Sequence, residues 1–176
     1  MLGTLITSKT RIKLLLKFFL NASNTGYLKN LESEFEDSSN GIRLELNKFE
    51  EAGLLTSAQV GNKKIFQANT RHPMFSDIHN ILLKYTGIDQ IIDTVVKRLG
   101  NVQSVYLTGS FAKGLESNII DIILIGDINK EYLINLIDKA EPLVGKKIRY
   151  VLYSIDEFKK NKSSILEEEH LLIWNT

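Results

Sequence analysis

Apolar residues in the N-terminal part of the chain recur at the three- and four-residue spacing of amphipathic helices. In the first such stretch Ile12, Leu15, Leu16 and Phe19 share one face, and Ser8 precedes them as a candidate N-cap. Two similar stretches follow, and the loops between them are rich in Asn, Ser and Gly. The pattern predicts helices at residues 7–20, 27–35 and 41–52.

After the third helix the apolar spacing changes to that of strands, and Gly53 is a candidate left-handed cap at the change. Residues 54–57 and 64–68 are predicted strands, joined around a turn at Gly61 and Asn62. Three helices followed by a β-hairpin predict a winged helix-turn-helix. Residues 46–55, LNKFEEAGLL, resemble the L-x-x-L-E-x-A-G-L-(L/V) run of bacterial ArsR- and MarR-type regulators, which covers the recognition helix and the entry to the wing.

The rest of the chain alternates between helical and strand patterns, which indicates an α/β unit with a mixed sheet. Helices are expected at 74–85, 88–99 and 130–141, and strands at 102–107, 121–125 and 148–153. Residues 156–174 are predicted as a helix that gives way to a short apolar segment at 171–174. The predicted fold class is α+β in two domains: a winged helix-turn-helix at 1–72, connecting helices at 73–100 and a second domain with the mixed sheet at 101–176.

The second domain carries a motif. Residues 108–114, TGSFAKG, are followed by Asp121, Ile122 and Ile123. This order resembles the signature of the DNA polymerase β-like nucleotidyltransferases, in which a Gly-Ser turn precedes a strand that carries Asp-x-Asp. The resemblance implies that residues 101–176 form an α/β nucleotidyltransferase-like domain. Asp121 takes the place of the first carboxylate, and Ile123 stands at the second. The resemblance places the third carboxylate on the next strand, here 148–153, which has no acid and whose one charge, Arg149, would repel a cation.

Nucleotidyl transfer depends on two divalent cations about 3.5–4 Å apart, and magnesium takes oxygen ligands. Residues i and i+2 of a strand point to the same face, but Ile123 has no ligand atom to offer beside Asp121. We therefore expect no catalytic residues, no metal site and no cofactor. Magnesium is expected only if the protein is an active enzyme, in which case Glu116 or Asp127 would supply a relocated acid to hold the metal.

The Gly-Ser turn itself has two interpretations. Its backbone N–H groups could hold a nucleotide phosphate, with Gly109, Ser110, Lys113 and Asp121 as the nucleotide-binding residues. Alternatively, Gly109 allows a tight strand-to-helix turn and Ser110 caps a helix that begins near Phe111.

The predicted DNA contacts lie on the third helix and the hairpin. Arg43 could address guanine and Asn47 adenine, while the lysines of the hairpin turn reach phosphate. Lys9, Arg11 and Lys13 of the first helix could add phosphate contacts, whereas Glu45 would oppose them. The candidate DNA-binding residues are Asn40, Arg43, Asn47, Lys48, Asn62, Lys63 and Lys64.

The composition mainly excludes certain kinds of bond, metal site and membrane segment. The chain has no cysteine, which excludes disulfides and thiolate metal sites, and its three histidines lack metal-ligand spacing. The apolar run at 12–20 contains Lys13 and Lys17 and is too short to cross a bilayer, and the N-terminus lacks a secretory signal pattern. We expect a cytoplasmic protein without membrane contact.

The sequence as a whole predicts a DNA-binding transcriptional regulator, in which an inactive nucleotidyltransferase-like domain serves sensing, dimerisation or partner binding. Double-stranded DNA is the expected partner, and a homodimer follows because a two-fold protein reads a palindrome. The apolar stripe of the helix at 74–85 could form the dimer seam or pack on its own domain. One alternative is an active or single-metal nucleotidyltransferase, and another is a non-catalytic protein-interaction module of toxin–antitoxin type.

Overall fold

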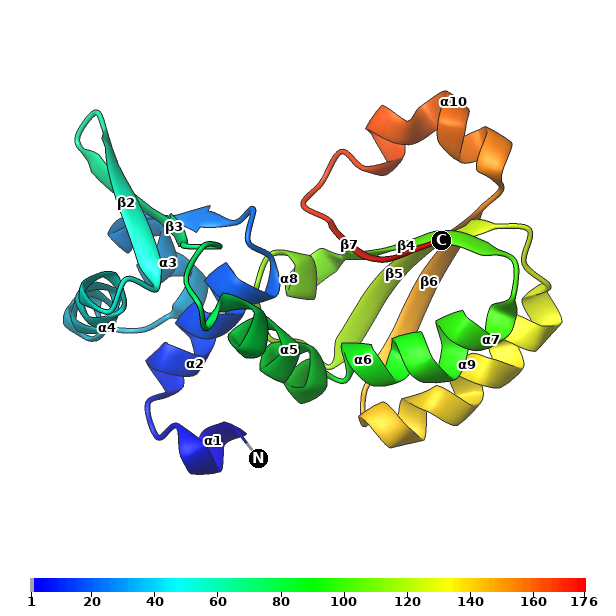
Figure 1. Ribbon diagram of the computed structural model, residues 1–176, viewed down its shortest axis with the longest axis horizontal. Helices are drawn as coiled ribbons and strands as arrows, with labels where there is room; N and C mark the ends of the chain where they lie inside the picture. Colours follow the sequence, from blue (N-terminus) through cyan, green and yellow to red (C-terminus); the bar gives the residue numbers. More distant parts are fainter. Residues whose placement is uncertain (1) are drawn as a thin grey trace. The chain divides into compact units, whose positions relative to one another are not determined.

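The computed structural model describes residues 2–176, which divide into two compact units (Figure 1). The first unit ends at Tyr85 and the second runs from Thr86 to Thr176. This boundary lies inside the segment 73–100 that was predicted to connect the domains, so its helices are divided between the units. In the described part of the chain, no helix is long and apolar enough to cross a membrane.

The first unit is mainly helical and contains one small sheet. Its helix α2 begins as predicted, because the Ser8 hydroxyl accepts a hydrogen bond of 3.2 Å from the Arg11 N–H. The predicted helix at 7–20 changes type within its length, since α2 continues directly into the π-helical segment η1. The elements are α1 (Leu2–Leu5), α2 (Lys9–Leu15), η1 (Leu16–Leu20), β1 (Thr25–Gly26), α3 (Leu28–Phe35), α4 (Ser39–Glu51), β2 (Leu55–Val60), β3 (Lys63–Ala68) and α5 (Phe75–Thr86).

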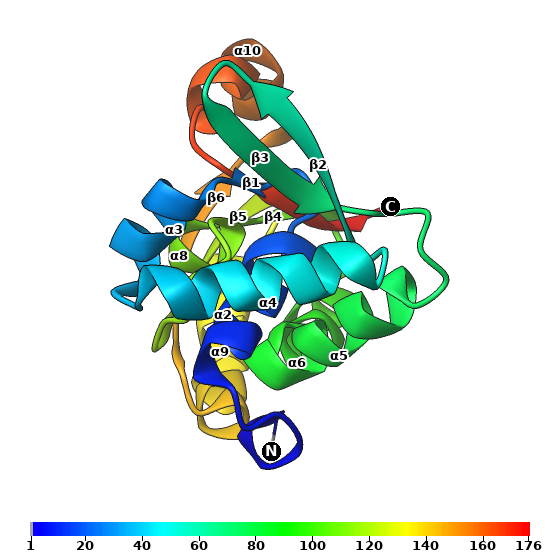
Figure 2. The same cartoon turned by 90° about the vertical axis from the view of Figure 1, so that its left-hand side faces the viewer.

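Strands β2 and β3 form the expected hairpin and are longer than predicted (Figure 2). Gly53 adopts the left-handed conformation predicted for it, with φ of 72°. Strand β1 was not predicted, because two residues are too few to show a period. It pairs antiparallel with β3, so the sheet has the order β1-β3-β2.

The core of the first unit is built from the apolar stripes that predicted its helices. Leu14, Phe18, Leu31 and Ile42 are fully buried. Helix α5 packs on this core, where the Phe75 and Phe19 rings lie 5.8 Å apart. The apolar stripe of α5 is therefore used at least in part within its own unit.

The second unit is a four-stranded sheet with helices on both faces (Figure 1). Its strand order is β6-β5-β4-β7, in which β5 and β6 are parallel and the other pairs antiparallel, so the predicted mixed sheet is confirmed. Helices α6, α7 and α9 lie on one face and α10 on the other. The elements are α6 (Ile88–Ile91), η2 (Ile92–Val96), α7 (Lys97–Leu99), β4 (Val102–Thr108), α8 (Gly109–Ala112), β5 (Ile119–Gly126), α9 (Lys130–Val144), β6 (Lys147–Tyr153), α10 (Ile155–Ile165) and β7 (Leu171–Asn175).

Two details of the second unit differ from the prediction. Ser110 does not cap a helix that begins near Phe111, because α8 already begins at Gly109, whose φ of 64° makes the turn directly after β4. The apolar segment at 171–174 follows a helix as predicted, but its strand conformation was not predicted. It belongs to β7, an edge strand that pairs with β4, and this long-range pairing decides its conformation.

Candidate functional site

Helix α4 has one buried and one exposed face, as its sequence period predicted. Ile42, Leu46 and Phe49 face the core. The opposite side is polar and exposed, and it carries the four candidate DNA-binding residues of this helix. These residues are Asn40, Arg43, Asn47 and Lys48.

The turn of the β2–β3 hairpin carries the other three candidates. Asn62, Lys63 and Lys64 are all exposed. A groove of about 740 Å³ runs between α3, α4 and the hairpin, and it brings together five of the seven candidates. It is lined by Tyr27, Leu28, Lys29, Glu32, Ser39, Arg43, Leu46, Asn47, Asn62, Lys63, Lys64 and Phe66. Asn40 and Lys48 lie outside this lining.

The basic side chains at the groove differ in whether a neighbouring acid compensates their charge. Arg43 forms no ion pair with any described residue. The Lys63 ammonium lies 4.3 Å from the centre of the Tyr27 ring, a cation–π contact that leaves its charge uncompensated. Lys64 is paired with Glu50, with 2.6 Å between Nζ and Oε2. Of these three side chains, Arg43 and Lys63 therefore remain available to an anion.

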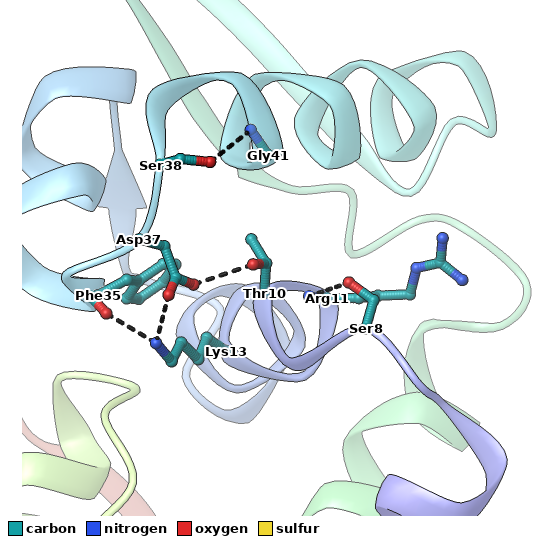
Figure 3. Close-up of polar contacts among 8 residues, drawn as sticks. All are labelled: Ser8, Thr10, Arg11, Lys13, Phe35, Asp37, Ser38 and Gly41. Carbon is teal, nitrogen blue, oxygen red and sulfur yellow. Dashed lines mark hydrogen bonds and ion pairs between the residues drawn. The ribbon is translucent and has the colours of Figure 1, made fainter.

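The cations of α2 are used mostly inside the unit. Lys13 donates to the Phe35 carbonyl at 2.7 Å and to Asp37 at 2.9 Å, and Thr10 also donates to Asp37 (Figure 3). Burial raises the pKa of the Asp37 carboxyl, but the hydrogen bonds from Lys13 and Thr10 outweigh it and leave the pKa lowered. This places Lys13 in an internal contact instead of the phosphate contact expected from the sequence.

Arg11 also forms an ion pair inside the unit. Its Nε and Nη2 donate to the two oxygens of Glu45, at 2.8 and 3.2 Å. The Glu45 side chain is only 8% exposed, and the hydrogen bond from Arg11 lowers its pKa. Glu45 was expected to face and repel phosphate. It instead joins α2 to α4 beneath the exposed face.

In the second unit, Asp121 lies on β5 directly beside Arg149 on the parallel strand β6. Arg149 Nε donates to Asp121 Oδ1 at 2.6 Å, and this hydrogen bond raises the pKa of the guanidinium. Arg149 was expected to repel a cation at this position. The structure shows in addition that it neutralises Asp121.

Asp121 and Arg149 line a pocket of about 420 Å³ that also contains Glu167 and Glu168, two acids that were not predicted to lie here. Lys113 reaches this region, since its Nζ lies 3.3 Å from Glu168 Oε2. No local pattern signals these acids, because they follow α10 and come near Asp121 only through the fold.

The two acids proposed as relocated ligands do not line this pocket. Asp127 follows the far end of β5, six residues from Asp121, which corresponds to roughly 20 Å along a strand. Glu116 lies in the loop between α8 and β5.

Magnesium, which the nucleotidyltransferase resemblance implies, does not fit these residues. The Asp121 carboxylate is held by a guanidinium, and Ile123 provides no oxygen. Over residues 2–176, no three His, Asp or Glu side chains gather in an arrangement that could hold a metal ion.

The Gly109 turn is fitted to Asp121. A Cβ atom at Gly109 would clash with the Asp121 carboxylate, and the φ of 64° also favours glycine. Ser110 is half-buried within the short helix α8. Of the four candidate nucleotide-binding residues, Gly109 and Asp121 are in contact, and Lys113 is directed to Glu168.

Comparison with known protein families supports the nucleotidyltransferase resemblance of the second unit. Residues 88–172 match the family model of the nucleotidyltransferase domain. Together with the mixed sheet, the match shows that the C-terminal part of the chain is a nucleotidyltransferase-like domain. No curated protein matches the chain.

Solved structures give weaker likenesses. AF1382 from Archaeoglobus fulgidus is 18% identical, with a TM-score of 0.38 over 53% of this chain and 98% of the other. A proposed nucleotidyltransferase from Sulfolobus solfataricus is 20% identical, with a TM-score of 0.38 over 57% of this chain and 87% of the other. A tri-AMPylated HEPN toxin in complex with MNT antitoxin, from Shewanella oneidensis, gives 16% identity and a TM-score of 0.38 over 53% and 73%. Similarity at this level carries no argument about function.

Proposed function

We propose that the protein is a DNA-binding transcriptional regulator. Its first unit acts as a winged helix-turn-helix, with α4 as the recognition helix and the β2–β3 hairpin as the wing. The observation that carries the proposal is the exposed face of α4, whose polar and basic residues share a groove with the hairpin turn. Arg43 and Asn47 are suited to base edges, and Lys63 to phosphate.

The ion pairs of α2 restrict this interface. Because Arg11 and Lys13 are held by Glu45 and Asp37, they add little to phosphate binding. The remaining contacts come from α4, the hairpin and the exposed Lys9, so we expect a modest number of phosphate contacts and a moderate salt dependence.

The test is binding to double-stranded genomic fragments, including the promoter of the protein's own gene, measured by fluorescence anisotropy over a range of salt. Arg43→Ala is expected to weaken specific binding by about 1–3 kcal/mol, because a bidentate base contact is lost. Lys63→Ala is expected to weaken binding to all DNA sequences alike. It should also reduce the slope of log affinity against log salt concentration by about one. Arg71→Ala is the matched control, since Arg71 is exposed in the same unit but outside the groove.

Two results would remove the proposal. One is the absence of salt-sensitive binding to any fragment. The other is equal binding by Arg43→Ala, Arg71→Ala and the unchanged protein.

We further infer that the nucleotidyltransferase-like domain is catalytically inactive and serves sensing, dimerisation or partner binding. The Asp121–Arg149 pair supports this inference, because the carboxylate already has a cationic partner. Incubation with labelled nucleotides and magnesium or manganese tests it, with Asp121→Ala as the control. Label transfer that depends on Asp121 would restore the enzyme alternative.

A homodimer is part of the proposal, because a palindromic site requires two copies of α4. Sedimentation equilibrium of the free protein, and of its complex with a DNA site, measures the stoichiometry. A single protein bound per site would contradict the dimer and leave DNA binding intact.

A further inference from the structure

The groove between α3, α4 and the hairpin has an apolar floor. Leu46 is 1% exposed and Phe66 is 4% exposed, and they form its base together with the half-buried Tyr27 and Leu28. The volume of about 740 Å³ lies within the range of roughly 300–1,000 Å³ typical of small-molecule sites. The phosphates of a DNA backbone are charged and would gain nothing from such an apolar floor.

The rim of the groove is predominantly cationic. Lys29, Arg43, Lys63 and Lys64 line it, against the single lining acid Glu32. The charge of Lys64 is compensated by Glu50, which leaves an excess of positive charge from the other three. Ser39, Asn47 and Asn62 add hydrogen-bonding groups at the rim. An apolar floor below a basic rim is complementary to a ligand that has an apolar body and an anionic group.

We propose that this groove binds a small amphipathic organic anion. Its apolar body lies on Leu46, Phe66 and the neighbouring side chains, and its anionic group contacts Arg43 and Lys63. Because Arg43 and Lys63 are also the candidate DNA contacts, the anion and DNA exclude one another. This second part rests on the proposed function, whereas the anion site does not.

The anion site is tested with anilinonaphthalene sulfonate, a fluorescent aromatic anion, on the full chain without DNA. The matched neutral probe is N-phenylnaphthylamine, which has the same apolar body and no sulfonate. We expect saturable binding of the anion, weakened about tenfold in Arg43→Ala and again in Lys63→Ala. Arg71→Ala is expected to bind like the unchanged protein.

Two outcomes overturn the anion site. In one, Arg43→Ala and Lys63→Ala bind the anion as tightly as Arg71→Ala. In the other, the neutral probe binds as tightly as the sulfonate. Near-UV circular dichroism of each variant shows whether its tertiary packing is intact, which separates a lost contact from the dye binding of a loosened core.

Competition with DNA is measured by anisotropy at rising probe concentration. Release of DNA at the concentration that saturates the groove supports mutual exclusion, and DNA that stays bound to the saturated protein overturns it. If no DNA fragment binds at all, the proposed function fails, and the dye titration still decides the anion site.

Discussion

At the residue scale, Glu45 illustrates how position decides the role of a charged side chain. It lies on α4 among residues that face solvent, yet its carboxylate is turned inward to Arg11 of α2. Two hydrogen bonds satisfy a group that would be costly to bury alone. The pair therefore links the two helices and removes a negative charge from the candidate DNA-binding face.

Glu45→Gln should destabilise the first unit by about 1–3 kcal/mol at neutral pH, the usual contribution of hydrogen bonds to a charged group. The hydrogen bond from Arg11 holds the pKa of Glu45 below its ordinary 4.5 in the folded state. Its contribution is thus complete above pH 4.5 and is lost as the pH falls through the lower folded value. The difference between the variant and the unchanged protein should shrink below pH 4.5.

Hydrogen exchange of the α2 and α4 amides measures this difference at several pH values. Glu51→Gln is the control, because Glu51 is exposed on the same helix and should change stability by less than about 0.5 kcal/mol. A difference that stays constant from neutral pH to well below 4.5 would show that the ion pair does not contribute as argued.

Gly109 is a second residue whose role depends on one close neighbour. Gly109→Ala should destabilise the second unit by about 2–4 kcal/mol, since a left-handed alanine and a crowded Cβ each add strain. Gly145→Ala is the matched control, with φ of 68° and nothing within 4 Å of the added Cβ. Gly145→Ala should reduce the stability of the second unit by only about 1–2 kcal/mol.

Urea denaturation followed by the fluorescence of Trp174, which lies in β7, gives these values. Adding Asp121→Ala to Gly109→Ala removes the carboxylate that the new Cβ meets, so the double variant should recover toward the loss seen for Gly145→Ala. Failure of this rescue would mean that crowding by Asp121 is not the cause.

At the element scale, the start of α4 controls the surface that the proposed function uses. The helix begins at Ser39, two residues before the predicted start, because the Ser38 hydroxyl accepts a hydrogen bond of 3.3 Å from the Gly41 N–H (Figure 3). Gly41 has a low helix propensity in this first turn, so the cap matters for its order. Asn40 and Arg43 lie in the first turns that the cap stabilises.

Ser38→Ala should destabilise α4 by about 1 kcal/mol and speed the exchange of the amides in its first turn, whereas Ser38→Asp should preserve the cap. Ser33→Ala is the control, since Ser33 is exposed within α3 and its replacement should change stability by less than about 0.5 kcal/mol. Amide hydrogen exchange measures all three variants. Equal exchange in Ser38→Ala and Ser33→Ala would show that the cap has no energetic role.

At the scale of the whole molecule, the chain folds as two units, each with its own sheet. The first unit buries apolar residues mainly from α2, η1, α3 and α4, and the apolar residues buried in the second unit include those of its strands, α6, η2 and α9. Stability changes in one unit should therefore leave the other largely unaffected.

Glu45→Gln should speed amide exchange in α2 and α4 and leave the urea transition followed by Trp174 unchanged. Gly109→Ala should shift the urea transition and leave exchange in α2 and α4 unchanged. A variant that combines Glu45→Gln with Gly109→Ala should show both effects, additive within about 0.5 kcal/mol. Hydrogen exchange and fluorescence on the same samples report the two units separately. A shift of both readouts by either single variant would contradict this independence.

The sequence by itself determined the features that depend on near neighbours along the chain. The helical period of α4 predicted its exposed face, Gly53 and Gly109 predicted their turns, and the motif around Gly109 predicted a nucleotidyltransferase-like domain. These features follow from backbone sterics and from which face of an element is apolar. The metal motif at Asp121 is likewise incomplete by residue type alone, because the side chain of Ile123 has no oxygen in any conformation.

Only the tertiary structure decided which distant groups meet. Arg11 and Glu45 are 34 residues apart and Asp121 and Arg149 are 28 apart, so no local period relates them. The strand β7, the acids near Asp121 and the apolar floor of the groove depend on the fold in the same way. The physical reason is that pairing between strands and burial between helices are set by the packing of whole elements, which a pattern of neighbours does not encode.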